Sequence, residues 1–158
     1  MKIHENEDGK LQLYDFNAFE AYKIAIKLEK DGISFYEKML LTFCDKEHVK
    51  IIEFLIKEEK KHLKFFQDCL NRIREEEDML EEDDIVEYMD SRVFENLDAD
   101  IENKSKDEIL DIALNAETNS IEFYTALEKC CEDVKTKKAL KVIIEDEKKH
   151  YETVKALK

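Results

Sequence analysis

Glu58-Glu59-Lys60-Lys61-His62 returns almost unchanged as Asp146-Glu147-Lys148-Lys149-His150. In each copy a glutamate precedes a histidine by three residues. On an α-helix the two side chains therefore project from one face, about 4.5 Å apart along the axis. At this spacing a carboxylate and an imidazole can hold neighbouring metal ions. The repeated Glu-x-x-His motif predicts two helices that carry metal ligands.

The repeat extends well beyond this motif. A shift of 88 residues, with no gap, aligns Ala25 with Ala113, Glu29 with Glu117, Ile33 with Ile121 and Tyr36 with Tyr124. Each half of the chain therefore carries a further glutamate and a tyrosine upstream of its Glu-x-x-His copy. This pattern predicts a duplicated helical hairpin.

The composition favours one all-α domain spanning residues 1–158. The chain has 43% hydrophobic residues, enough to fill a core, and 42% charged residues, which suit the exposed faces of long helices. It contains no proline and two glycines, and it therefore lacks the turn residues of a many-stranded fold.

The net charge of −14 argues against nucleic acid and anionic membrane surfaces as partners, because both would repel the chain. No apolar run approaches transmembrane length, and the acidic N-terminus does not resemble a signal peptide. We therefore expect a cytoplasmic protein. The four cysteines form no C-x-x-C pair, which is typical of reduced structural thiols and excludes a rubredoxin-like or zinc-ribbon module.

Capping residues and apolar stripes predict four helices. Asn17 with Glu20 and Ser105 with Glu108 form capping-box patterns, and Asp45 and Asp133 are suitable N-caps. The predicted helices cover residues 17–43, 46–74, 105–130 and 134–157. Residues 1–16 are predicted to form a polar arm followed by an apolar anchor at Leu11, Leu13, Tyr14 and Phe16.

Residues 75–104 are predicted to form a long crossover between the two hairpins, with a short helix over residues 85–94. The segment contains two acidic runs, Glu75-Glu76-Glu77-Asp78 and Glu81-Glu82-Asp83-Asp84. Such runs can attract cations, but charge blocks usually remain solvated and extended, and we favour the solvated connection.

The six repeated ligand candidates occupy positions where apolar residues are expected. Glu29 lies about 15 residues before the first turn and the pair Glu59 and His62 about 16 after it, so both sit roughly 24 Å from that turn at 1.5 Å per residue. Glu117, Glu147 and His150 have the same spacing about the second turn. Docking the hairpins can therefore bring four carboxylates and two imidazoles into one layer.

Electrostatics favours a metal in such a layer. Four ionised glutamates in a dry core repel one another, and each carries a desolvation penalty of several kcal/mol. Two divalent cations cancel the four negative charges. Without metal, the layer requires protonation, mutual hydrogen bonds or water, with raised carboxylate pKa values.

At these residues the sequence resembles the ferritin-like superfamily, and within it the rubrerythrin-like branch. The resemblance covers residues 17–157 and rests on Glu29, Glu59-x-x-His62, Glu117 and Glu147-x-x-His150. It implies a ferritin-like four-helix bundle, made of two antiparallel hairpins joined by a long crossover, that holds a di-iron centre. By this resemblance, Glu59 and Glu147 would bridge two iron ions, Glu29 and Glu117 would be terminal ligands, and His62 and His150 would each bind one metal.

The resemblance also implies an activity and partners. A rubrerythrin-like protein would reduce hydrogen peroxide and would be expected to form a homodimer. Rubrerythrins carry an extra glutamate where this chain has Ser120, and a rubredoxin domain on four cysteines that this chain lacks. Because the rubredoxin domain is missing, we expect an external electron donor such as a rubredoxin-like protein. Because Ser120 replaces the extra glutamate, we expect that the redox-linked exchange of metal ligands known in the family is altered.

Residues near the predicted ligands offer further roles. Tyr36 and Tyr124 lie seven residues after Glu29 and Glu117 and are predicted to hydrogen-bond to a ligand carboxylate of the opposite hairpin, although simple core packing is an alternative. Gly32 either leaves room for peroxide or dioxygen or permits close helix packing. His48 lies on the same stripe but is expected at a helix end, away from the metals.

Three alternatives to peroxide reduction stay open. The chain can be a ferroxidase that oxidises Fe(II) and passes the iron on, or a structural helical bundle whose buried acids bind no metal. A third alternative keeps the site and fills it with manganese or zinc, because this ligand set does not discriminate among these metals by affinity alone.

Overall fold

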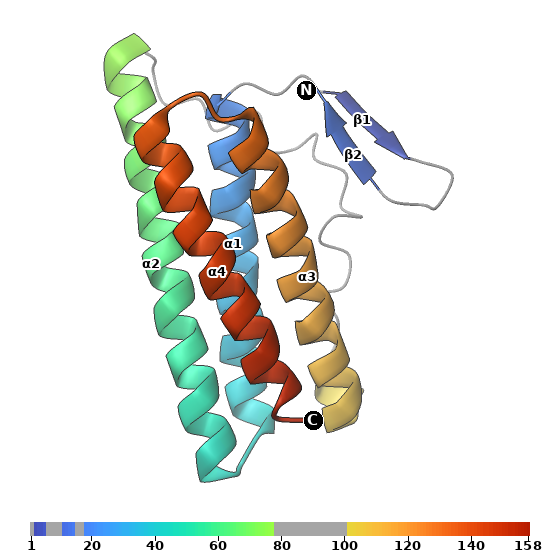
Figure 1. The fold of residues 1–158 in the computed structure, drawn as a ribbon. Helices are drawn as coiled ribbons and strands as arrows, with labels where there is room; N and C mark the ends of the chain where they lie inside the picture. Colours follow the sequence, from blue (N-terminus) through green and yellow to red (C-terminus); the bar gives the residue numbers. More distant parts are fainter. Residues whose placement is uncertain (1, 6–10, 15–17, 78–100) are drawn as a thin grey trace.

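The computed structural model describes residues 2–5, 11–14, 18–77 and 101–158. Its elements are β1 (Lys2–Glu5), β2 (Leu11–Tyr14), α1 (Ala18–Thr42), α2 (Lys46–Glu77), the short 3-10 helix η3 (Ile101–Asn103), α3 (Lys106–Cys130) and α4 (Val134–Lys155). The four long helices lie side by side as a bundle (Figure 1). The predicted all-α four-helix bundle is confirmed.

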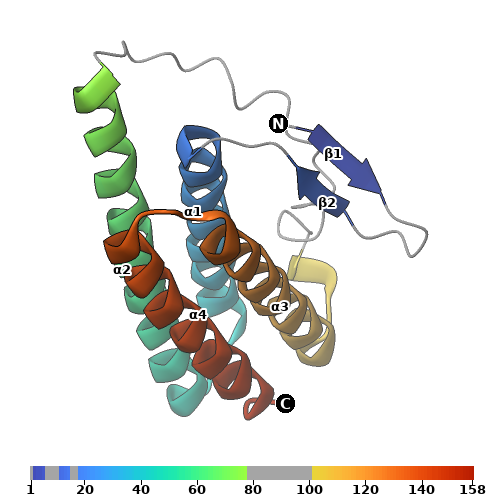
Figure 2. The ribbon, with the colours of Figure 1, turned by 45° about the horizontal axis from the view of Figure 1, so that its top comes forward.

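The bundle consists of two antiparallel hairpins, as the duplication predicts. α1 packs along α2 and α3 packs along α4, while α1 meets α3 and α2 meets α4 between the hairpins. An oblique view of the bundle shows this arrangement of pairs (Figure 2). Among the described helices, none is long and apolar enough to cross a membrane.

Helix boundaries follow the predicted caps. Ser105 accepts from the Glu108 N–H while the Glu108 side chain accepts from the Ser105 N–H, which completes a capping box. Asp133 accepts from the Thr136 N–H, and Asp45 accepts from the N–H groups of the first turn of α2. The predicted cap at Asn17 lies outside the described residues.

Two helix ends lie two or three residues from the predicted ones. α2 continues to Glu77 instead of ending at residue 74, because the run from Arg74 to Glu77 consists of residues that favour helix. α4 ends at Lys155 instead of residue 157, and the N–H of Ala156 caps it by donating to the Glu152 carbonyl. The predicted short helix over residues 85–94 lies outside the described residues.

Part of the arm predicted at residues 1–16 forms two short strands that the sequence analysis did not predict. β1 and β2 form an antiparallel pair, with Lys2 opposite Tyr14 and Glu5 opposite Leu11. Each strand has four residues, which is the shortest run in which alternation indicates a strand, so the sequence signal is weak.

The bundle core consists of two apolar clusters separated by a layer of polar side chains. One cluster includes Phe19, Leu28, Phe66, Tyr124 and Leu140, and the other includes Ile33, Phe43, Leu55, Leu110 and Val154. On each helix, residues of the two clusters lie on either side of the predicted ligands. The polar layer therefore crosses the middle of the bundle.

Gly32 of α1 does not serve close helix packing. A Cβ atom built on its backbone meets no atom within 4 Å in the part of the chain that the structure describes. Glycine in a helix interior destabilises a protein relative to alanine because the unfolded chain gains freedom. The space beside Gly32 is therefore open among the described residues, and packing between helices does not explain why this position is a glycine.

Gly32→Ala is expected to raise the free energy of unfolding of the metal-free protein by about 0.5–1 kcal/mol. Urea denaturation followed by circular dichroism measures this change. A variant that is less stable than the wild type would show that Gly32 meets a constraint other than space.

Candidate metal centre

The polar layer contains all six residues that the sequence predicts as metal ligands. They are Glu29 on α1, Glu59 and His62 on α2, Glu117 on α3, and Glu147 and His150 on α4, and none is more than 5% exposed. Helical periodicity explains this placement, because each residue continues the core-facing stripe of its helix. The predicted convergence of the six side chains is confirmed.

Each histidine faces three carboxylates. His62 Nδ1 lies 2.9 Å from Glu147 Oε1, 3.3 Å from Glu59 Oε2 and 3.9 Å from Glu29 Oε1. His150 Nδ1 lies 3.2 Å from Glu59 Oε1, 3.8 Å from Glu147 Oε2 and 3.9 Å from Glu117 Oε2. The two histidine rings stack with centroids 5.6 Å apart. The site therefore has two equivalent halves.

These halves form two groups that can hold a metal ion. Glu29, Glu59, His62 and Glu147 make one group, and Glu59, Glu117, Glu147 and His150 make the other; within each, the ligand atoms lie within 4.8 Å of one another. Glu59 and Glu147 belong to both groups, whereas Glu29 and Glu117 each belong to one. Two shared carboxylates are the arrangement that a two-metal centre needs.

Several buried atoms of this layer have no hydrogen bond. Glu117 Oε2, Glu147 Oε1 and His150 Nδ1 are inaccessible to solvent and have no hydrogen-bond partner in the described parts of the chain. Two of them lie in ion pairs, since Glu147 Oε1 is 2.9 Å from His62 Nδ1 and His150 Nδ1 is 3.2 Å from Glu59 Oε1. Leaving such groups unsatisfied costs about 1–3 kcal/mol each. A cation bound between these side chains would satisfy the two carboxylate oxygens and, once the imidazole has lost its proton, the His150 nitrogen.

The acid–base properties of the layer reflect the same crowding. Burial, with the neighbouring Glu59 and Glu147 carboxylates, raises the pKa of Glu29 well above its usual value. The same three causes raise the pKa of Glu117. For Glu59, burial also favours the neutral form, but contacts with His150 and His62 outweigh it, and the pKa of Glu59 is lowered.

The pKa values of the two histidines are raised, whereas burial alone lowers the pKa of an imidazole. Burial disfavours the imidazolium, but the carboxylates of Glu147 and Glu59 outweigh this effect and raise the pKa of His62 to about 10. The same balance raises the pKa of His150 to about 9. Without metal, the imidazolium forms of both histidines offset part of the negative charge of the layer at neutral pH, and the raised pKa values of Glu29 and Glu117 favour the neutral forms of these carboxyls.

Two tyrosines hold the unshared glutamates from across the bundle. The Tyr36 hydroxyl on α1 donates to Glu117 Oε1 on α3, and the Tyr124 hydroxyl on α3 donates to Glu29 Oε1 on α1. Phe66 stacks on the Tyr124 ring at a centroid distance of 5.1 Å. The predicted hydrogen bonds between hairpins are confirmed, and each tyrosine fixes the orientation of one carboxylate.

Other sequence predictions lie away from the layer. His48 is at the start of α2, where its Nδ1 lies 3.0 Å from Asp45 Oδ1 and its ring packs on Phe43, so it is a helix-end residue. The four cysteines are free thiols. The sequence analysis missed the contact between Phe54 and His150, whose rings meet edge-on with centroids 6.5 Å apart. Phe54 is 50% exposed and lies beside the ligand stripe of α2, and this position in the sequence could have indicated the contact.

Comparison with known proteins agrees with this site. No curated protein sequence matches the chain. A solved structure that it resembles, from Thermotoga maritima, is described as that of a candidate ferritin-like diiron-carboxylate protein. That structure superposes with a TM-score of 0.69 over 92% of this chain and 97% of the other, at 24% sequence identity. This similarity shows a shared fold.

A family model described as Rubrerythrin matches residues 6–70 and 20–158 of the sequence. These matches cover nearly the whole chain, including all four helices and the complete polar layer. The chain therefore belongs to the rubrerythrin family.

Proposed function

We propose that this protein is a di-iron oxidoreductase that reduces hydrogen peroxide to water with electrons from an external donor. The observation that carries the proposal is the pair of four-residue groups that share Glu59 and Glu147. Membership of the rubrerythrin family and the fold shared with a diiron-carboxylate protein support iron as the metal.

The ligand roles follow from the two groups. Glu59 and Glu147 would each contact both metals, Glu29 and His62 would complete one site, and Glu117 and His150 the other. Four carboxylates balance the charge of two divalent ions, and the imidazoles add the nitrogen ligands that iron accepts. When bound, two ferrous ions supply the two electrons that peroxide cleavage requires.

Two tyrosines and the apolar clusters orient the ligands of the polar layer and exclude water from it. Tyr36 and Tyr124 hold Glu117 and Glu29 through their hydroxyls, so each unshared carboxylate keeps one oxygen for the metal. Burial raises the pKa of both tyrosines well above the usual value, which keeps these hydroxyls protonated donors. The apolar clusters on either side keep bulk water from the layer. The reduction consumes one peroxide, two protons and two electrons and yields two waters.

Alanine substitutions separate shared from unshared ligands. Glu59→Ala or Glu147→Ala is expected to abolish binding of the metal pair, because each removes a ligand from both groups. Glu29→Ala or Glu117→Ala is expected to weaken one site and leave the other occupied. Metal content after desalting, measured on protein loaded anaerobically with ferrous ions, gives the ratio per chain.

Glu145→Ala is the matched control, because Glu145 is an exposed glutamate on the same helix as Glu147. It is expected to retain two metals per chain, and circular dichroism should show unchanged helical content in all five variants. Two metals per chain in Glu59→Ala and Glu147→Ala would refute the ligand assignment.

Metal affinity is expected to rise with pH. In the metal-free layer His62 and His150 hold protons at neutral pH because their pKa values are raised to about 10 and about 9, and a metal ligand must lose its proton. Each ion therefore displaces the proton of one histidine, and affinity increases through neutral pH until the histidines titrate at about 9 and 10. Manganese titrations between about pH 6.5 and 8.5, with proton release followed by an indicator dye, measure this slope. A pH-independent affinity would contradict it.

Single-turnover oxidation tests the reaction itself. Anaerobic protein loaded with two ferrous ions per chain should be oxidised completely by one equivalent of peroxide, with a rise in near-ultraviolet absorption, and should be reducible for another cycle. Glu59→Ala is expected to show none of this rapid phase. Release of ferric iron after oxidation would instead identify an iron-handling ferroxidase, and failure to bind iron would leave a structural bundle.

A further inference from the structure

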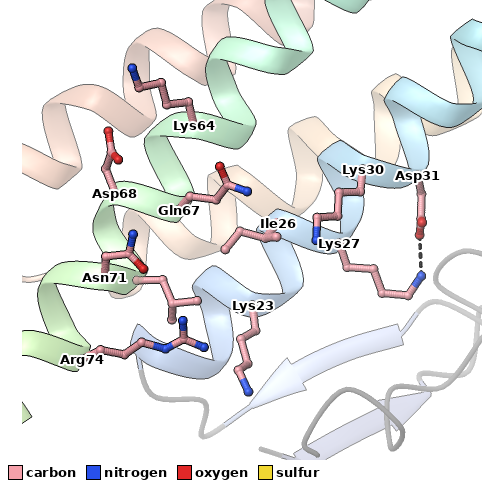
Figure 3. A pocket seen from close by; sticks show the side chains of 11 residues that line it. Lys23, Ile26, Lys27, Lys30, Asp31, Lys64, Gln67, Asp68, Asn71 and Arg74 are labelled. Carbon is pink, nitrogen blue, oxygen red and sulfur yellow. Dashed lines mark hydrogen bonds and ion pairs between the residues drawn. The ribbon is translucent and has the colours of Figure 1, made fainter. Parts of the chain in front are cut away.

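A groove on the outer surface of the first hairpin has a charge opposite to that of the protein. It lies between α1 and α2 and encloses about 820 Å³. Figure 3 shows its lining, in which Ile26 lies between the two helices and polar side chains surround it. The cationic residues are Lys23, Lys27, Lys30, Lys64 and Arg74, against the two carboxylates of Asp31 and Asp68. The whole chain, by contrast, has a net charge of −14.

Several of these cations are not neutralised by the protein. Lys30 and Lys64 are exposed and have no ion pair in the described parts of the chain, and Arg74 Nε is buried there without a hydrogen-bond partner. Some lysines on other faces form ion pairs, for example Lys148 with Glu145 and Lys149 with Asp146. An excess of unpaired positive charge in an acidic protein selects an anionic partner.

The groove lies beside one half of the metal centre. Lys30 follows Glu29 directly on α1, and Lys64 lies two residues after His62 on α2. Glu29 and His62 face the bundle interior, whereas both lysines face outward into the groove. A helix with its side chains is about 10–12 Å across, so a molecule seated in the groove is separated from the metal layer by roughly one helix. Electrons can cross such a distance between protein-bound centres.

We infer that this groove is the docking site of the electron donor, and that the donor is an electron-transfer protein with an acidic surface around its redox centre. This inference rests on the proposed function, which requires an external donor. The cations steer and orient the acidic surface, and the apolar floor made by Ile26 and Leu70 provides contact area at the centre of the interface.

Charge reversal of the two unpaired lysines tests the docking site. In Lys30→Glu/Lys64→Glu, the second-order rate constant for reduction of the iron-loaded, peroxide-oxidised protein by reduced rubredoxin should fall at least about tenfold at low salt. The salt dependence of that rate constant should also become shallower. The matched control is Lys135→Glu/Lys138→Glu on α4, which changes the net charge equally at exposed positions outside the groove and should retain the wild-type rate within about twofold.

A binding measurement gives a readout independent of turnover. Zinc-loaded rubredoxin, added to isotope-labelled metal-free protein, should shift amide resonances of α1 and α2 around Lys27, Lys30 and Lys64. The groove variant should weaken this binding about tenfold, and the α4 variant should not. The inference would be overturned by shifts confined to another face or by an equal loss of binding in both variants. It would also be overturned if the small anion ATP, but not rubredoxin, shifted the resonances of the groove.

The design separates this inference from the proposed function. Peroxide is uncharged and oxidises the ferrous protein without a donor, so single-turnover oxidation should be the same in the wild type and both charge variants. If that oxidation fails in the wild type, the proposed function fails. If it succeeds while rubredoxin reduces both variants at equal rates, the docking site is wrong and the peroxide reaction stands.

Discussion

The structure depends on the burial of four carboxylates and two imidazoles at mid-height of a helical bundle. Such a layer costs several kcal/mol per charge unless it is neutralised, and it divides the apolar core into two clusters. Each helix must therefore change from apolar to ionisable and back within a few turns. The apolar clusters on both sides stabilise the bundle and keep the layer dry. The fold tolerates the layer because protons or metal ions can neutralise it.

The duplication gives this layer its symmetry. Each hairpin contributes one unshared glutamate, one shared glutamate and one histidine, so docking two equal units produces two equal metal groups. The tyrosine bonds cross between hairpins, from Tyr36 to Glu117 and from Tyr124 to Glu29. Neither hairpin alone can form a complete group or orient its own unshared carboxylate. Formation of the site is therefore coupled to docking of the two halves.

The ligands of the polar layer and the lysines of the groove belong to different faces of the same helices. The histidines belong to α2 and α4, and the tyrosine-bound glutamates belong to α1 and α3, so the two kinds of ligand approach the layer from different sides of the bundle. Lys30 and Lys64 lie outside the half that contains Glu29 and His62. An overall charge of −14 conceals this local reversal, because composition averages over faces that a partner meets separately.

The sequence by itself determined the four helices, the caps at Ser105, Asp45 and Asp133, and the identity of all six residues in the polar layer. These features depend on local periodicity and on an internal repeat, both of which are visible without coordinates. It missed the β1–β2 pair and the basic groove. The resemblance to a known family, and not the local pattern, implied that Glu59 and Glu147 are shared. Only the tertiary structure decided which oxygens the tyrosines hold and that Gly32 faces open space in the described part of the chain. The tyrosine bonds join residues 81 and 95 positions apart, and such residues meet only after the hairpins dock.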